Sequence, residues 1–528
     1  MRGGLLTLLS LTLAATTSSS PESGSRLPVA NATKSFWIDT PGSNPLAEEG
    51  SSGELTRRSD VCIIGSGITG VSVAWHISQA WRHEQQKPSV TIFEAREFCS
   101  GATGRNGGHL TRNAFSAFLR REALYGTSES LKSYRLEEYT ANSLVDFITA
   151  RELSDAVGLV EGGHLQIFRT EDDEVAAKKD YDAYQAAREV HFGAREELGV
   201  RWIGTEELAK EYGVDANLNY TAVYFIGHNL WPCKLVTELF KDSNNIVLHT
   251  KTPVTAITPL VDGLSASHDQ TPLTTDETRD RWTLHTPRGT VACKYVVHAT
   301  NAYASHLLPF LSGSNSNNTN PALPRGAHGI IPTRGQVGTV RAAVSAEELP
   351  WLNSWDGGAG GWEYWFPRYQ DTLKSQKNPL IVFGGARQHS GGTLETGMVD
   401  DSIVNPLVTA ALRRFLPTVF PGQFGEVPDE REAEGDPWEM EWTGIMGFTS
   451  TGEPLVGPIT RPQTPGSIKD SRTYNGQYIA AGFTGHGMPR AYACAEVVAG
   501  MITADIWGVE WKKPEWLPER YLNWATHP

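Results

Sequence analysis

A glycine-rich turn followed by an acidic residue is the feature of this chain whose spacing most directly implies chemistry. The turn, residues 65–70 (GSGITG), directly follows an apolar segment, and Glu94 ends the next one. A strand, a GxGxxG turn, a helix start and a strand-end acid form a dinucleotide-binding βαβ unit. Gly65 permits the tight bend, Gly67 lets a pyrophosphate approach the backbone, and Gly70 lets the helix pack on the strand. Glu94 would accept hydrogen bonds from ribose hydroxyls, which favours NAD or FAD over NADP.

The loop that follows Glu94 separates these two cofactors. Residues 99–109 read CSGATGRNGGH, with four glycines and embedded polar side chains. Backbone N–H groups of such a loop can lie along a second flat, polar part of a ligand, which favours FAD. Arg105 either contacts the pyrophosphate or braces the loop.

These features resemble the family of FAD-dependent amine and amino-acid oxidases, which includes D-amino-acid oxidase, glycine oxidase and sarcosine oxidase. Further blocks that fit in order are 228–235 (HNLWPCKL), 296–303 (VVHATNAY), 332–336 (PTRGQ) and 482–488 (GFTGHGM). The segments RNGGHL and GFTGHGM are similar to those of the gamma-glutamylputrescine oxidase-like and fungal FAD-dependent members. The resemblance spans roughly residues 35 to 504.

The resemblance implies a fold of the α/β plus α+β class. A Rossmann-type FAD-binding domain is interleaved with a substrate domain built on a mainly antiparallel sheet. We predict a signal peptide and an extended N-terminal arm, then three FAD-domain parts alternating with two substrate-domain parts. The boundaries, in chain order, are 1–20, 21–58, 59–155, 156–218, 219–308, 309–441 and 442–528, the last including the C-terminal tail.

Hydrophobic periodicity predicts the elements that position these segments. We expect helices at 118–125, 137–152 and 173–194, a break at 126–130, a short helix capped by Thr205, and a helix start near Pro489. We expect strands at 163–168, 330–339, 362–367 and 380–385, paired strand segments within 245–257, and a hairpin at 281–289.

The resemblance also implies which residues bind the cofactor. These are Gly65, Ser66, Gly67, Ile68, Thr69, Gly70, Glu94, Ala95, Ser100, Thr103, Gly104, Arg105, Asn106, Gly107, Gly108, Val254, Ala299, Thr300, Asn301, Gly482, Gly485, Gly487 and Met488. His109 and His486 are the catalytic candidates beside the flavin ring. His486 and the helix start that follows it would stabilise negative charge developing on that ring.

For the substrate we nominate Trp231, Arg334, Tyr364, Arg368 and Trp442. The two arginines could bind a carboxylate through two hydrogen bonds each, although a buried brace between domains also fits Arg334. Tyr364 fits either a pocket wall or ordinary packing.

Related sarcosine oxidases carry FAD covalently on a cysteine near the segment that corresponds to 442–447, which here contains none. We therefore predict non-covalent FAD, with Cys99 or Cys233 as alternative attachment points. Five cysteines are too few for a disulfide scaffold, and Cys62 and Cys494 are expected in the core. The Cys and His spacings predict no metal site.

Composition excludes some classes of partner and suggests a compartment. The chain has 528 residues and a net charge of −14 without a long basic run, which argues against nucleic-acid binding. The N-terminal apolar run is typical of a secretory signal and too short for a membrane anchor. Sequons at Asn31, Asn219 and Asn317 agree with a secreted glycoprotein, and a cytoplasmic location is the alternative.

The predicted function is oxidation of a C–N bond of an amine or amino-acid-like substrate by hydride transfer to FAD, with O2 as the electron acceptor. We expect the protein to be a monomer. One alternative is a dehydrogenase or ring-forming biosynthetic flavoenzyme of the same fold. Another is a non-enzymatic FAD-binding assembly protein.

Overall fold

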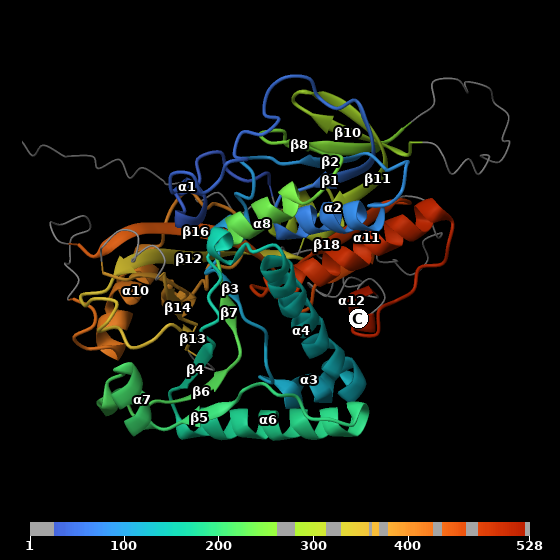
Figure 1. Ribbon diagram of the computed structural model, residues 1–528. Coiled ribbons are helices and arrows are strands. Elements are labelled where there is room, and N and C mark those ends of the chain that lie inside the picture. The colour runs from blue at the N-terminus through green and yellow to red at the C-terminus, as the bar shows by residue number, and fades with distance from the viewer. Residues whose placement is uncertain are drawn as a thin grey trace, which may run out of the picture.

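The computed structural model describes residues 26–260, 280–312, 329–357, 362–368, 378–425, 436–460 and 474–522. The signal-peptide prediction and the sequon at Asn317 fall outside these residues. The described chain forms two large sheets with helices around them (Figure 1).

The first sheet belongs to the predicted FAD domain. Its central strands are parallel, and an antiparallel strand, β17, lies at one edge. In spatial order they are β17 (Leu455–Pro458), β18 (Gln477–Ala481), β11 (Gly289–His298), β1 (Arg58–Ile64), β2 (Val90–Phe93) and β8 (Ile246–His249). The hairpin partners β10 (Trp282–Thr286) and β9 (Ala256–Pro259) extend from β11.

Helices α2 (Ile68–Ala80), α8 (Pro232–Lys241) and α11 (Ala491–Trp507) pack together on one side of this sheet (Figure 1). Alternate residues of β1 face two different cores. Val61 and Ile63 pack with the helices, whereas Cys62 and Ile64 pack with the β10–β11 hairpin. Burial on both faces explains why β1 reads as a continuous apolar run.

The second sheet is antiparallel except where β13 pairs with β4. In spatial order it holds β16 (Trp438–Phe448), β12 (Ile331–Arg341), β15 (Leu380–Gly384), β14 (Tyr364–Pro367), β13 (Ser354–Asp356), β4 (His164–Phe168), β6 (Thr221–Phe225) and β5 (Arg201–Ile203). One face carries Trp355, Trp365 and Phe383 and packs on α10 (Pro406–Val419). The residues between them therefore point to the opposite face, toward the FAD domain.

The remaining elements connect these two layers. Helix α4 contacts α11 at the FAD domain and α3 and α6 at the far end (Figure 1). The further elements are α1 (Phe36–Asp39), β3 (His109–Leu110), α3 (Phe118–Tyr125), α4 (Thr127–Ala150), α5 (Ser154–Val157), α6 (Glu171–Phe192), α7 (Thr205–Tyr212), β7 (His228–Asn229) and α12 (Glu519–Leu522). No helix in the described part of the chain has the length and apolar character needed to span a bilayer.

Several local expectations differ from the structure. Helix α4 begins at Thr127, because Gly126 alone, at φ 77°, breaks the chain direction after α3. The N-cap of α7 is Gly204 rather than Thr205, and it has no side-chain cap. The segment 245–257 does not pair with itself, since β8 joins β2 and β9 joins β10.

The second sheet also extends beyond the boundaries expected for the substrate domain. Strand β6 pairs with β4 and β5, so this sheet continues past residue 218, to Phe225. Strand β16 pairs with β12 along its whole length, across the expected boundary at 441/442. Strand pairing is non-local, and composition changes do not mark where it ends.

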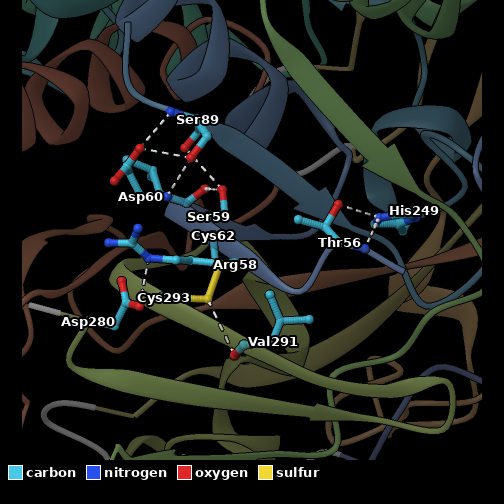
Figure 2. Close-up of a disulfide and its surroundings, with 11 residues drawn as sticks. Thr56, Arg58, Ser59, Asp60, Cys62, Ser89, His249, Asp280, Val291 and Cys293 are labelled. Atoms are coloured by element: carbon cyan, nitrogen blue, oxygen red, sulfur yellow. Dashed lines mark hydrogen bonds and ion pairs between the residues drawn. A yellow bond between two sulfur atoms is a disulfide. The ribbon is translucent and has the colours of Figure 1, made fainter. Parts of the chain in front are cut away.

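A disulfide joins two neighbouring central strands of the FAD sheet, β1 and β11. Cys62 of β1 is bonded to Cys293 of β11, and both are fully buried (Figure 2). The expectation that Cys62 is a core residue is correct for burial, but sequence reasoning missed its partner, 231 positions away. Cys99, Cys233 and Cys494 are free and buried.

We expect alkylation of the denatured, unreduced protein to label only the three free cysteines, and all five after reduction. Intact-mass analysis after iodoacetamide treatment measures this difference directly. Labelling of all five without reduction would contradict the Cys62–Cys293 bond.

Candidate active site

One continuous cavity of about 560 Å³ lies between the glycine turn and the face of the second sheet that points toward the FAD domain. Its walls come from β1, the start of α2, the loop after β2, the turn at 299–303 that follows β11 and the segment before α11. The carboxyl ends of the parallel strands meet there, which is where such sheets bind their ligands.

The three turn glycines have different surroundings, and these separate a structural role from a binding role. At Gly65 (φ 107°) a Cβ atom would lie 2.6 Å from the Ala299 carbonyl oxygen. At Gly70 it would lie 1.9 Å from the Gly65 carbonyl oxygen. At Gly67 it would approach only the Thr103 side chain, at 3.0 Å. Gly65 and Gly70 are therefore needed by the fold, whereas a side chain at Gly67 would enter the cavity.

Glu94 is held rigidly at the cavity wall. One carboxylate oxygen accepts from Ser66 N and Oγ at 3.0 and 2.8 Å, and the other accepts from Arg96 N at 3.0 Å. Oε2 uses both of its lone-pair sites on Ser66, but Oε1 uses only one, on Arg96 N, so Glu94 can still accept from a ribose hydroxyl. The glycine cradle, the start of α2 and this fixed acceptor fit the adenosine diphosphate part of FAD.

Arg105 braces the glycine-rich loop. Its guanidinium donates to the carbonyl oxygens of Ser100 (2.9 Å), Thr33 (2.7 Å) and Thr443 (3.1 Å). Burial, and then the charge of Arg96, lower the pKa of Arg105. Arg105 also lines the cavity, but these three bonds make bracing its structural task.

The N-terminal arm contributes to the cofactor site, which sequence reasoning missed. Leu27 and Pro28 line the cavity. Ser35 Oγ donates to the Gly104 carbonyl at 2.6 Å, and Trp37 Nε1 donates to the Asn106 carbonyl at 2.6 Å. The only sign of this in the sequence was the aromatic pair Phe36-Trp37 within a segment rich in Ser and Pro.

Most residues expected to bind FAD lie in the cavity wall. Five lie behind it: Ser66, Gly70, Ser100, Gly104 and Gly482. Ser66 supports Glu94, Ser100 supports Arg105, and Gly70 and Gly104 allow close backbone packing. The eighteen in the wall are Gly65, Gly67, Ile68, Thr69, Glu94, Ala95, Thr103, Arg105, Asn106, Gly107, Gly108, Val254, Ala299, Thr300, Asn301, Gly485, Gly487 and Met488.

His486 lines the cavity and is anchored by a buried acid. Its Nε2 lies 3.0 Å from Glu137 Oε2, and Arg490 Nε donates to the other oxygen at 2.8 Å. Burial alone would raise the pKa of Glu137, but His486 and Arg490 outweigh it and hold the pKa well below its usual range. Because an ionised carboxylate only accepts, Nε2 carries a proton, and Nδ1 is the nitrogen left for the cavity.

His109 lines the same cavity from the glycine loop. Its Nδ1 lies 3.1 Å from the Gly107 carbonyl oxygen, and its ring packs edge-on against Tyr364 and Phe366. Burial, and then the nearby His164, lower the pKa of His109 to about 4. The imidazole is therefore neutral at pH 7.

Of the five residues nominated for the substrate, only Tyr364 lines the cavity. Trp231 Nε1 donates to the Trp37 carbonyl at 2.7 Å, and Trp442 Nε1 donates to the Arg105 carbonyl at 2.9 Å. Both indoles are buried supports of the arm and the loop. Their assignment to the substrate is corrected accordingly.

The two nominated arginines are also engaged elsewhere. Arg334 forms a buried ion pair with Glu395 and donates to the Asp400 carbonyl, which makes it a buried brace, although within the second sheet's domain rather than between domains. Arg368 is buried over the rings of Trp37 and Trp231. Neither guanidinium reaches the cavity, so neither fits a substrate carboxylate.

Arg387 is the guanidinium that sequence reasoning missed. It lines the cavity, with its Cζ atom 5.0 Å from the ring centroids of both Trp362 and Phe448. Its guanidinium donates a long hydrogen bond, 3.4 Å, to the Leu394 carbonyl. Burial lowers the pKa of Arg387, and within the described residues it forms no ion pair. Such a group fits an anionic ligand group.

Three polar residues of the second sheet, His164, Gln166 and Asp356, also line the cavity and were not predicted. Each comes from a strand whose alternation points it toward the FAD domain. In the described residues no group of three or more His, Cys, Asp or Glu side chains could hold a metal ion.

Solved structures with the same fold include an oxidase, a deaminase and a dehydrogenase named for amino acids. Glycine oxidase from Geobacillus kaustophilus has a TM-score of 0.56 and 20% identity, covering 88% of this chain and 98% of that one. L-amino acid deaminase from Proteus myxofaciens, in complex with anthranilate, has a TM-score of 0.60 and 14% identity, covering 95% and 98%. L-proline dehydrogenase from P. horikoshii has a TM-score of 0.59 and 17% identity, covering 89% and 98%.

A curated relative matches over a short segment. Gamma-glutamylputrescine oxidoreductase of Escherichia coli (strain K12) is 42% identical over 57 residues, which is 11% of this chain and 12% of that protein. The family model described as FAD dependent oxidoreductase, DAO, matches residues 60–501. The match begins in β1, the strand before the glycine turn, and ends within α11. This chain therefore belongs to the DAO family of FAD-dependent oxidoreductases.

Proposed function

We propose that this protein oxidises a C–N bond of an amine or amino-acid-like substrate, with O2 as the electron acceptor. The observation that carries the proposal is the continuity of one cavity from the glycine turn to the polar face of the second sheet. FAD, when bound, would supply the acceptor for the hydride, and so for both electrons, of the C–H bond beside nitrogen. The protein has to bind, orient and desolvate the substrate.

The residues of the cavity divide into these tasks. The aromatic side chains of Trp362, Tyr364 and Phe448 form an apolar part of the cavity wall. Arg387 between two of them suits a substrate carboxylate. His109, neutral at pH 7, places no cation beside the amine, whose nitrogen has to be neutral when the hydride leaves.

The decisive experiment mixes purified holoprotein anaerobically with a panel of amines and amino acids. Loss of flavin absorbance with at least one of them, followed by peroxide formation when air is admitted, is the expected result. Absorbance loss without peroxide would favour the same-fold dehydrogenase. A flavin that is photoreduced but bleached by no member of the panel would favour a non-enzymatic assembly protein.

FAD is expected to be bound without a covalent link. The segment 442–447 lacks a cysteine, and Cys99 and Cys233 are fully buried and absent from the cavity wall. Acid precipitation should therefore leave the yellow colour in the supernatant. Colour that remains in the washed pellet would show a covalent link.

His486→Ala is expected to slow the anaerobic loss of flavin absorbance, raising the barrier by about 2–4 kcal/mol if an imidazole that also carries a proton on Nδ1 stabilises developing negative charge. FAD content should stay close to the parental value, because Arg490 still pairs with Glu137. His109→Ala is the comparison, and it should affect FAD retention or substrate access more than this rate. An unchanged rate in His486→Ala would mean that backbone N–H groups at Gly485 and Gly487, and not the imidazole, stabilise the negative charge developing on the flavin.

We also propose a secretory location and a monomeric state. The buried Cys62–Cys293 bond suits an oxidising compartment, and the sequon residues Asn31 and Asn219 are exposed. Expression in a eukaryotic host followed by glycosidase treatment tests the first point. A secreted protein whose mobility does not change would remove the glycoprotein part.

A further inference from the structure

The N-terminal arm is anchored at Thr33, beside the FAD cavity. Thr33 N donates to the Asp401 carbonyl at 2.8 Å, and the Thr33 carbonyl accepts from Arg105 Nη1 at 2.7 Å. Thr33 Oγ1 accepts from Thr443 N at 2.9 Å. Thr443 belongs to β16 of the second sheet, whereas Arg105 belongs to the glycine-rich loop of the FAD domain. Thr33 is therefore held by both layers of the fold.

The residues just before this anchor lie against the cavity. Leu27 and Pro28 are part of its wall, and both are partly buried. The Val29 carbonyl accepts from Arg96 Nη1 at 3.3 Å, which is longer than the three bonds given above for the anchor. Residues 27–29 therefore border the cavity on one side and solvent on the other, and they are attached less tightly than Thr33.

This part of the arm lies at the end of the cavity that fits the adenosine diphosphate part of FAD. Arg96 N donates to Glu94 Oε1 at 3.0 Å, and Glu94 is the acceptor positioned for a ribose hydroxyl. The Arg96 guanidinium is fixed by a buried ion pair with Asp401, through hydrogen bonds of 2.9 and 3.0 Å. Arg96 therefore connects the arm to the ribose site, through Nη1 on one side and its backbone N on the other.

We propose that Leu27 and Pro28 bind FAD as a strap across its adenosine diphosphate part, and that residues 27–32 must move away from the cavity before FAD can enter or leave. The proposal rests on FAD binding by this family and does not depend on the substrate. The closed strap removes the apolar Leu27 side chain from water. Pro28 restricts the backbone and so lowers the entropy lost when the strap becomes ordered.

A strap of this kind slows FAD movement in both directions. Release is slow because the Leu27 contact with FAD has to be broken first. Entry is slow because only the open form of the arm accepts FAD, so the closed fraction of the apoprotein does not contribute. An ordinary contact would slow release alone, and this difference separates a strap from simple packing.

The test measures FAD exchange in a holoprotein that combines Leu27→Ser with Pro28→Gly. Exchange of bound FAD against an excess of isotope-labelled FAD, sampled by rapid desalting and mass spectrometry, gives the dissociation rate. The change in flavin fluorescence as FAD binds to the apoprotein gives the association rate. Each rate is expected to rise by about tenfold, the scale of losing one partly buried leucine contact.

Ala30→Ser is the matched control, because Ala30 is an exposed residue of the same arm outside the cavity wall. It should leave both rates at the parental values. The double variant should keep the melting temperature of the parental apoprotein, since the anchor at Thr33 is unchanged. A rise in the dissociation rate alone would overturn the strap, because Leu27 and Pro28 would then be ordinary contacts. Equal rates in the double variant and the parent, including no exchange in either protein, would also overturn it.

Discussion

Gly67→Val is expected to yield a folded protein that emerges from gel filtration without FAD. A Cβ atom at Gly67 meets only the Thr103 side chain, at 3.0 Å, so the fold can accept it. The rest of the valine side chain would enter the cavity where the pyrophosphate must approach the backbone. We expect FAD affinity to fall at least 100-fold, about 2.7 kcal/mol. The ratio of flavin to protein absorbance measures the bound FAD. The melting temperature of the apoprotein shows whether the variant is folded.

Gly70→Val is the matched control, because its Cβ would lie 1.9 Å from the Gly65 carbonyl oxygen. That variant should lose the fold rather than the cofactor alone. Glu94→Ala should weaken FAD less than Gly67→Val, since it removes one acceptor and adds no obstruction. A Gly67→Val protein that is folded and fully yellow would disprove the placement of the pyrophosphate at this turn.

Arg387→Met is expected to lower kcat/KM for a substrate that carries a carboxylate by about 100- to 1000-fold, or roughly 3–4 kcal/mol, the scale of two charge-assisted hydrogen bonds. The guanidinium lines the cavity between Trp362 and Phe448 and has no ion-pair partner among the described residues. FAD content should not change, because the hydrogen bond and ring contacts of Arg387 in the described chain are with Trp362, Phe448 and Leu394, and none is with the glycine turn. Steady-state kinetics with an amino acid and with its decarboxylated amine give the comparison.

The decarboxylated amine should lose much less, because it makes no use of the guanidinium. Arg387→Lys should recover part of the difference as a point charge. Arg341→Met, at a partly exposed arginine paired with Glu439, controls for loss of a cation from the same sheet. Equal losses for both substrates in Arg387→Met would mean that Arg387 organises the wall and does not bind a carboxylate.

Local sequence was sufficient for the glycine turn, Glu94 and the glycine-rich loop, but it missed the N-terminal arm at the same cavity and the Cys62–Cys293 bond. The turn at 65–70, the acid Glu94 and the glycine loop act through neighbours in the chain, so their spacing alone predicted how they lie around the cavity. The family match over residues 60–501 and the fold of the solved relatives agree with that prediction. The helix at 118–125 and the hairpin at 281–289 were likewise predicted correctly, because each depends on a short pattern and an adjacent turn.

The substrate side depended on the tertiary structure. Arg334, Arg368 and Arg387 are the same residue type in similar apolar surroundings, and no local pattern says which one reaches the cavity. Their places in the folded chain decide it: Arg334 lies within β12 and pairs with Glu395, Arg368 follows β14 and packs over Trp37 and Trp231, and Arg387 follows β15 beside the cavity. Strand pairing places Asp356 beside His164, nearly two hundred positions apart in the chain. Cys62 and Cys293 are joined for the same reason, because β1 and β11 become neighbours only when the sheet forms.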